Sequence, residues 1–278
     1  MNGCAMIKAA AAALAIAFAG AAGAQPAKVQ VQWLGQAAFK ITSPGGKVIV
    51  VDPWLTTNPE TPEAYRKLEA LGKVDLVLVS HGHFDHFDHF ADAPALAKMH
   101  NAPFWGPAGL SQSMQVLGIL PPAQAGRMNK SGSVTPVGPG VKVTMTHAEN
   151  SSELLWRNPA TGKDEVHVGG EPAGFIIELE NGFRIWHMGD TGVFGDMKLI
   201  GEMYRPDLVL MPIGGGPFVM NPADAALAAR ELIKAKAVVP MHYGTNPLLP
   251  GTPEEFIKAL GNSPVKVLVM QPGDTLEF

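Results

Sequence analysis

Four apolar segments of this chain each lead to a histidine or an aspartate, and this arrangement most constrains how the chain can fold. Strand-like runs at 74–79, 141–146, 183–188 and 238–240 are followed by His81, His147, Asp190 and His242. Short apolar runs bounded by turn residues are typical of buried strands. Loops at the ends of such strands can converge on one site above a rigid scaffold. The pattern therefore predicts a strand-rich core that presents polar side chains at one edge.

The order of the expected elements favours a layered α/β fold. Strands are expected at 29–34, 37–42, 47–51, 173–180, 208–212 and 265–270, and helices at 63–71, 91–100, 109–117, 223–235 and 253–260. Hairpins rich in β structure are thus followed by strand–helix alternation, and this sequence of elements occurs twice. A layered α/β sandwich fits this order better than a simple doubly wound sheet.

Length and composition exclude several classes of protein. The 278 residues are 46% hydrophobic and 17% charged, which is enough apolar material for a full core and excludes a disordered chain. The formal net charge of −4, without a basic block, argues against a nucleic-acid partner. Cys4 is the only cysteine, so neither an intrachain disulfide nor a cysteine-based zinc site can form.

Residues 1–24 have the pattern of a secretory signal peptide. Lys8 precedes a short apolar run at 9–18, and Ala22-Gly23-Ala24 forms a small-residue cleavage site. A buried Ala-rich helix or a membrane anchor is less favoured, because the apolar run is short for a span. We therefore expect cleavage after Ala24, no stable membrane anchor afterwards, a single domain at 25–278, and a periplasmic or secreted bacterial protein.

The segment Ser80–His89, SHGHFDHFDH, carries the densest group of candidate metal ligands. The pattern His81-x-His83-x-Asp85-His86 places four such side chains within six residues. Neutral imidazole and carboxylate groups suit zinc, iron or manganese and need no thiolate. His81 and His83 can point to one side of an extended loop, while Asp85 and His86 can face a second ion. The alternative is a solvated histidine-rich loop, and the matching residues downstream weigh against it.

The downstream candidates are Asp190, in WHMGDTG, and His242, in PMHYG. A histidine at a strand end is, taken alone, more often a hydrogen-bonded structural residue than a ligand. The upstream motif reverses that expectation for Asp190 and His242. His187 lies inside its strand, so we expect it to be a core residue or one that orients a ligand.

These motifs resemble those of the metallo-β-lactamase superfamily over nearly the whole chain after residue 24. The similarity rests on Asp52 after an apolar strand (VIVVDPW), the motif at 81–86, a histidine region near 147–150, Gly189-Asp190-Thr191 and His242. More narrowly, the chain is similar to the metal-dependent hydrolase branch related to the ascorbate-6-phosphate lactonases. This similarity rests on four segments: GDTGVFGDMKLIGE (189–202), LMPIGG (210–215), ADAALAARELIKAKAVVPMHYGTNP (223–247) and EEF (254–256).

The resemblance implies a four-layer αββα sandwich, the metallo-β-lactamase fold, with a dinuclear metal site at one edge. It implies two divalent ions, zinc first and manganese or iron as alternatives. One ion would be held by His81, His83 and a third-motif residue, the other by Asp85, His86 and His242, with Asp190 bridging both. Asp52 would orient the histidine-rich loop.

The third motif departs from the family's pattern. The family usually places a ligand histidine immediately before a small hydroxyl pair, but in HAENSSE (147–153) that position is Asn150. His147 lies three residues earlier and is slightly favoured as the ligand. Alternatively, Asn150 ligates weakly through its carbonyl oxygen, which should lower the affinity for a borderline-soft ion.

We therefore expect a metal-dependent hydrolase of a small-molecule substrate. A metal-bridged hydroxide, formed because the ions lower the pKa of water toward about 7, would cleave an ester, lactone or phosphodiester bond. Asp85 and Asp190 are the expected catalytic carboxylates. The main alternative is a periplasmic metal- or ligand-binding protein of the same fold with weak or no catalysis. Related hydrolases often self-associate, so a homo-oligomer is expected by analogy.

Overall fold

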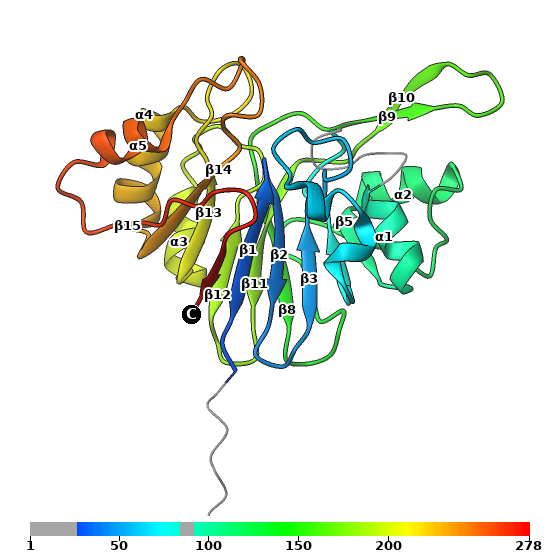
Figure 1. Ribbon diagram of the computed structural model, residues 1–278, viewed down its shortest axis with the longest axis horizontal. Coiled ribbons are helices and arrows are strands. Elements are labelled where there is room, and N and C mark those ends of the chain that lie inside the picture. The colour runs from blue at the N-terminus through cyan, green and yellow to red at the C-terminus, as the bar shows by residue number, and fades with distance from the viewer. Residues whose placement is uncertain (1–26, 84–91) are drawn as a thin grey trace, which may run out of the picture.

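The computed structural model, which describes residues 27–83 and 92–278, contains two seven-stranded β-sheets packed face to face (Figure 1). The first sheet has the order β16-β1-β2-β3-β4-β5-β6, with β1 Gln30–Gly35, β2 Ala38–Thr42, β3 Val48–Val51, β4 Leu76–Leu78, β5 Phe104–Pro107, β6 Ala125–Met128 and β16 Thr275–Glu277. The second has the order β15-β14-β13-β12-β11-β8-β7, with β7 Ser133–Val134, β8 Lys142–His147, β11 Ala173–Glu178, β12 Arg184–His187, β13 Leu208–Pro212, β14 Ala237–Met241 and β15 Lys266–Val267. A separate two-stranded arm pairs β9 Glu153–Arg157 with β10 Asp164–Val168.

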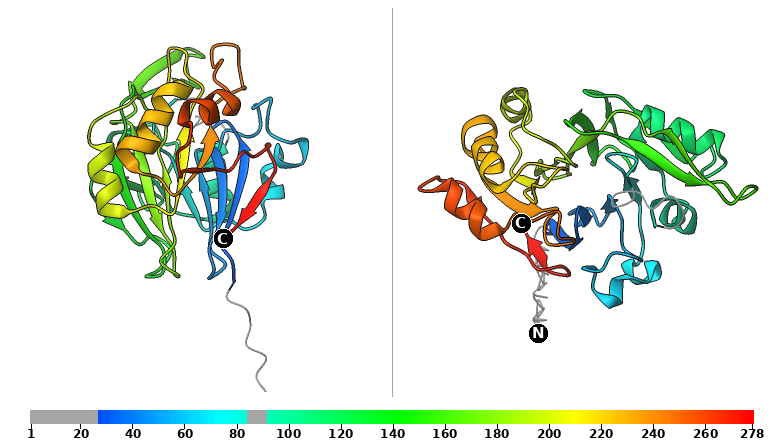
Figure 2. Two further views of the ribbon diagram at one scale, coloured as in Figure 1. Left: turned by 90° about the vertical axis from the view of Figure 1, so that its left-hand side faces the viewer. Right: turned by 90° about the horizontal axis from the view of Figure 1, so that it is seen from above.

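Helices cover the outer face of each sheet (Figure 2). Helices α1 Asp92–His100 and α2 Ala108–Val116 pack on the first sheet, and α3 Met197–Tyr204, α4 Pro222–Leu227 and α5 Pro253–Leu260 pack on the second. The layers therefore run helix, sheet, sheet, helix, and the predicted αββα sandwich is confirmed.

The strands β4 and β13 are apolar throughout because both of their faces are buried. In β4, Leu76 and Leu78 belong to the core between the sheets, whereas Val77 belongs to the core under α1 and α2. In β13, Leu208 and Leu210 face the other sheet and Val209 faces the helices. Successive side chains of a strand point to opposite faces, and here both faces are covered.

Three expected elements differ from the structure. The helix expected at 63–71 is two short 3-10 turns, Glu63–Tyr65 and Leu68–Leu71, because Lys67 between them is extended (φ −96°, ψ 116°). The helix expected at 223–235 changes after α4 into a wider π-helical segment, Ala228–Ile233. The strand expected at 265–270 is only β15, and the chain ends instead on β16, which pairs with β1 at the edge of the first sheet.

Among the helices of residues 27–83 and 92–278, none combines the length and the apolar character that a membrane span requires. The predicted signal peptide and its cleavage site after Ala24 lie outside the described residues.

Candidate metal centre

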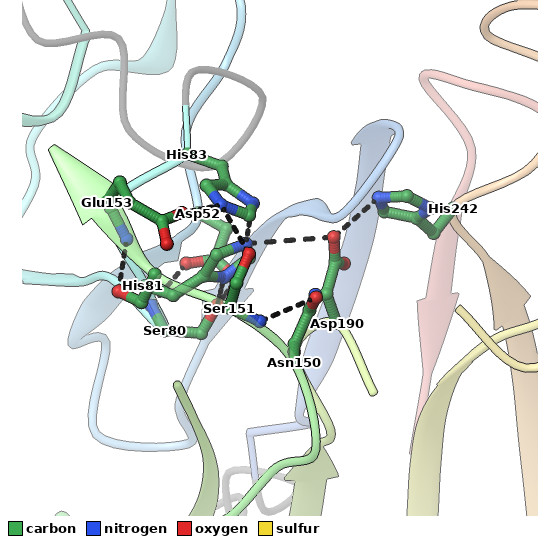
Figure 3. A network of polar contacts seen from close by, with 12 residues as sticks. Asp52, Ser80, His81, His83, Asn150, Ser151, Glu153, Asp190 and His242 are labelled. Carbon is green, nitrogen blue, oxygen red and sulfur yellow. Dashed lines mark hydrogen bonds and ion pairs between the residues drawn. The ribbon is translucent and has the colours of Figure 1, made fainter. Parts of the chain in front are cut away.

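Loops at the carboxyl-terminal ends of parallel strands bring four of the predicted ligands together. His81 and His83 follow β4, Asp190 follows β12 and His242 follows β14. The His242 Nε2 atom lies 2.9 Å from Asp190 Oδ2, and His81 Nε2 lies 3.7 Å from the same oxygen. His81 Nε2 is also 3.1 Å from His83 Nδ1 (Figure 3). Asp190 thus lies between a histidine from each sheet.

Asp52 and Ser80 determine which nitrogen of His81 carries its proton. Asp52 follows β3, the strand next to β4, and its carboxylate accepts the Ser80 N–H at 2.7 Å and the Ser80 hydroxyl at 2.8 Å. The hydroxyl has a single proton, so toward His81 Nδ1, at 2.9 Å, the Ser80 oxygen acts as the acceptor. His81 is therefore protonated at Nδ1, and its Nε2 presents a lone pair to the site.

The opposite arrangement applies to His83. Its Nε2 lies 3.0 Å from Glu153 Oε2 and 3.3 Å from Ser151 Oγ. A carboxylate only accepts hydrogen bonds, so Nε2 of His83 carries the proton and Nδ1 presents the lone pair. The lone pairs of His81 Nε2 and His83 Nδ1 consequently face one another at 3.1 Å.

The donor set fits a divalent cation. Two facing lone pairs repel unless a cation lies with them, and the Asp190 carboxylate beside them adds negative charge. Two nitrogens bound at the usual zinc distance in a tetrahedral site lie about 3.3 Å apart, which is close to the 3.1 Å between His81 and His83. Within residues 27–83 and 92–278, no three histidine, cysteine, aspartate or glutamate side chains form a complete metal cluster. The predicted ligands Asp85 and His86 lie outside the described residues.

Backbone conformation aims two of these side chains. Asp52 (φ 46°) and His242 (φ 57°) both adopt the left-handed region, which is uncommon for residues other than glycine. The His242 N–H donates to the carbonyl of Gln36 at 3.0 Å, which helps to hold this conformation. Such strain costs about 1–3 kcal/mol per residue and persists where the surrounding structure holds it.

Gly189 makes the turn that delivers Asp190. It has φ 63°, and a Cβ atom at this position would lie only 2.4 Å from the carbonyl oxygen of Ala173. A larger residue would therefore push the β12 loop away from β11.

His187 belongs to the core next to the site. It is fully buried, lies 2.9 Å from the carbonyl oxygen of Ala37 through Nε2, and accepts the Gly189 N–H at Nδ1 at 3.2 Å. Each ring nitrogen thus has a backbone partner, and the contact with Gly189 helps to hold the turn that precedes Asp190.

His147, the slightly preferred third-motif ligand, does not line the pocket that His83, Asp190 and His242 line. His147 is the last residue of β8, paired with Ala173, so the pleat of the strand fixes its direction. Its Nδ1 accepts from the Lys130 ammonium at 3.0 Å, and its Nε2 lies 3.2 Å from Glu149 Oε2. Asn150, in contrast, lines the same pocket as His83, Asp190 and His242.

A pocket of about 650 Å³ opens over these residues. Its polar part contains His83, Asp190 and His242, and its apolar part is formed by Leu155, Val166, Pro217, Phe218 and Leu249. Ligand pockets commonly have volumes of about 300–1,000 Å³. The site therefore has room for a small molecule next to its polar residues.

The sequence interpretation missed Glu153 and the β9–β10 arm that carries it. The turn residues Asn158, Pro159 and Gly162 lie between two alternating runs and were the available signal for a hairpin. No local pattern, however, relates Glu153 to His83, 70 residues earlier.

Tyr243, next to His242, keeps its proton at neutral pH. Burial, together with the negative charge of Glu254, raises the pKa of its hydroxyl to about 12. Its ring packs on Trp33, with ring centroids 5.4 Å apart, so it supports the His242 loop as a neutral side chain.

Comparisons with known proteins agree with the fold described above. A family model described as a beta-lactamase superfamily domain matches residues 47–243. A Polaromonas protein named UPF0173 metal-dependent hydrolase is 61% identical over 257 residues, covering 92% of each chain. The solved structure of Igni18, described as a novel metallo hydrolase from the archaeon Ignicoccus hospitalis, is 32% identical, with a TM-score of 0.75, and covers 90% of this chain and 98% of that one. The metallo-beta-lactamase fold protein YhfI from Bacillus subtilis, at 14% identity and a TM-score of 0.64 over 90% of this chain and 99% of its own, is similar in fold.

Proposed function

Because the chain belongs to the metallo-β-lactamase superfamily, we propose that it is a metal-dependent hydrolase that cleaves an ester, lactone or phosphodiester bond in a small molecule. The observation that carries the proposal is the 3.1 Å contact between His81 Nε2 and His83 Nδ1 beside the Asp190 carboxylate, while Ser80 and Glu153 occupy the other nitrogen of each ring. The metal-dependent hydrolase names of the relatives support the same reaction class.

We assign the residues that would hold the ions as follows. His81 and His83, with Asn150 near them, would hold one ion, His242 with Asp85 and His86 would hold the second, and Asp190 would contact both. Zinc is preferred because the set consists of imidazoles and carboxylates, and manganese or iron are the alternatives. Bound ions of this kind polarise a substrate oxygen and make a water nucleophilic at neutral pH.

The chain's own residues keep this donor set in place. Asp52, through Ser80, holds the proton of His81 on Nδ1, and Glu153 holds the proton of His83 on Nε2. Neither ring can then turn its protonated side toward the site without losing a hydrogen bond. Such outer partners commonly change metal affinity by about 10–100-fold when they are removed.

The experiment combines metal analysis with a substrate panel. The chain is loaded separately with Zn²⁺, Mn²⁺ and Fe²⁺, its metal content is measured, and turnover is followed on p-nitrophenyl acetate, a γ-lactone and bis-p-nitrophenyl phosphate. We expect metal binding and metal-dependent turnover of at least one substrate class, and loss of both in Asp190→Ala. Turnover that survives metal removal, or that survives in Asp190→Ala with full metal content, would contradict the proposed site.

The presence of Asn150, rather than a histidine, in the pocket favours a second candidate function. A neutral amide oxygen binds a borderline-soft ion less well than imidazole does. The chain would then be a metal- or ligand-binding protein with weak or no catalysis. Tight metal binding without turnover of any panel substrate would support this candidate over the hydrolase.

The proposal extends to the location of the protein. The pattern of residues 1–24 supports export to the periplasm or the medium. Sequencing the amino terminus of the protein from its host tests this, and we expect it to begin at Gln25. Recovery of the chain with residues 1–24 in the cytosol would refute export.

A further inference from the structure

We propose that the exposed face of the β9–β10 arm is a substrate-binding wall, and that the substrate is a neutral ester or lactone with an apolar chain lying on that wall. This inference rests on the proposed hydrolase function and narrows its substrate class. It follows from the two faces of the arm, its attachment to the metal loop, and the charge of the pocket.

The arm has one buried and one exposed face. Leu154 points into the core that includes Leu110 and Met114 of α2. Leu155 and Val166 are directly paired across the two strands and lie on the opposite face, where they are 43% and 70% exposed. Both line the pocket beside the proposed metal ligands. Figure 1 shows the arm extending past α2 away from the two sheets.

The base of the arm is fastened to the histidine-rich loop. The Gly82 N–H donates to Ser152 Oγ at 3.1 Å, and Glu153 accepts from His83 at 3.0 Å. A Cβ atom at Gly82 would lie only 2.8 Å from the carbonyl oxygen of Glu153, so loop and arm are in close contact. The apolar face is therefore held in a fixed position relative to the reacting end of the pocket, as a preorganised subsite requires.

A second group of apolar side chains, from a distant part of the chain, lines the same pocket. It consists of Pro217, Phe218 and Leu249, and Phe218 is 46% exposed. Exposed apolar side chains that converge on one pocket mark a ligand site more often than ordinary surface. A chain lying against both groups would remove them from water while its ester carbonyl lies at His83, Asp190 and His242.

Away from the proposed ions, the described lining of the pocket offers no cationic side chain to an anionic group. Of the described residues that line it, none is lysine or arginine, whereas Glu153 and Asp190 are carboxylates. Proteins that bind phosphate groups usually supply arginine or lysine donors. The proposed ions would themselves bind a phosphate at the reacting end, but an anionic group further along the substrate, such as the phosphate of a phosphorylated lactone, would meet no such donor, so a neutral carboxylic ester or lactone fits better.

The test uses Val166→Asp with Val116→Asp as a matched control. Val116, the last residue of α2, is also a largely exposed valine, at 80% against 70%, but it does not line the pocket. Because both side chains are largely exposed, neither change should impair folding, which circular dichroism checks. The substrates are p-nitrophenyl acetate, butyrate and hexanoate, and the binding probe is 2-octanone, a neutral ketone with no bond to hydrolyse.

In the wild type we expect kcat/KM to rise about two- to fourfold for each methylene added to the acyl chain. Val166→Asp should lower kcat/KM for the hexanoate, and the affinity for 2-octanone, by about tenfold, since an apolar chain would lie against a charge. The acetate rate should change by less than about twofold, and Val116→Asp should behave as the wild type.

The outcomes separate this inference from the function on which it rests. Normal acetate turnover without dependence on chain length, or equal effects of the two variants, would refute the arm as a substrate wall and leave the hydrolase intact. A preference for bis-p-nitrophenyl phosphate over all the esters would refute the neutral substrate. If no substrate is turned over but the wild type still binds 2-octanone more tightly than Val166→Asp does, the hydrolase is refuted and the apolar site is retained.

Discussion

Replacing Asp52 by asparagine should reverse the tautomer of His81 without changing the shape of the site. Oδ1 of the new amide can still accept the Ser80 N–H, now 2.7 Å from the carboxylate. The amide nitrogen then faces Ser80 Oγ and must donate to it. The Ser80 hydroxyl is thereby turned to donate to His81 Nδ1, which moves the ring proton to Nε2, the nitrogen that faces His83 and Asp190.

The magnitude follows from the groups involved. Asp52 is fully buried, and its two hydrogen bonds from Ser80 are charge-assisted, each contributing about 1.5–3 kcal/mol. Metal binding must displace the proton from Nε2 of His81, and the free energy of restoring the original tautomer reduces the binding free energy. We therefore expect the metal affinity to fall by about 10–100-fold, or about 1.4–2.8 kcal/mol.

The assay measures the dissociation constant of Zn²⁺ by competition with a chelator, and nitrogen NMR of the apo-protein reads the tautomer of His81. Asp75→Asn is the matched control, because Asp75 is also a largely buried carboxylate that accepts a backbone N–H, from Val48 at 3.0 Å, but lies away from the pocket. It should leave zinc affinity unchanged. The reasoning is refuted if Asp52→Asn binds zinc as tightly as the wild type, or if His81 keeps its proton on Nδ1.

Three further predictions concern the packing and electrostatics of the fold. Gly82→Ala should lower the melting temperature and weaken metal binding, because its Cβ would lie 2.8 Å from the Glu153 carbonyl oxygen and overpacking costs about 1–3 kcal/mol. An unchanged melting temperature and zinc affinity would show that the arm can shift to accommodate the methyl group. Trp186→Ala should cost about 3–5 kcal/mol in chemical denaturation, since this fully buried side chain fills the core under the helices of the second sheet; a loss below about 1 kcal/mol would contradict that packing. Although burial raises the pKa of the Asp75 carboxyl, hydrogen bonds from Lys73 and the Val48 N–H and the nearby lysine charges bring it below its usual 3.8. A carboxyl whose pKa is lowered by folding stabilises the folded protein above its usual pKa, and this stabilisation is lost as the pH falls through the folded-state pKa. Asp75→Asn should therefore be less stable than the wild type at pH 7, and the difference should shrink in acid. A stability difference that does not depend on pH would rule out this linkage.

Much of the fold can be predicted from the sequence because its main determinants are local. The continuous apolar runs of β4, β13 and β14 reflect burial on both faces, and each run ends where its loop begins. Parallel strands place their carboxyl ends on one edge, so the meeting of Asp190 and His242 follows from their positions after β12 and β14. His81, after β4 of the other sheet, joins them because the two sheets pack face to face. The strand β16 could not be predicted in this way, since its residues 275–277 become a strand only through pairing with β1 at the other end of the chain.

The identity of the candidate ligands was thus determined by the sequence, and their protonation and surroundings were decided by the tertiary structure. Residue types and the ends of apolar runs can be read from local sequence, and they predict that imidazole and carboxylate groups lie at one edge of the sheets. Whether His147 or Asn150 reaches the pocket depends on the pairing of β8 with β11, which directs His147 toward Lys130 and Glu149. The proton positions on the rings depend on single hydrogen bonds from distant segments, and such contacts leave no periodic trace in the chain.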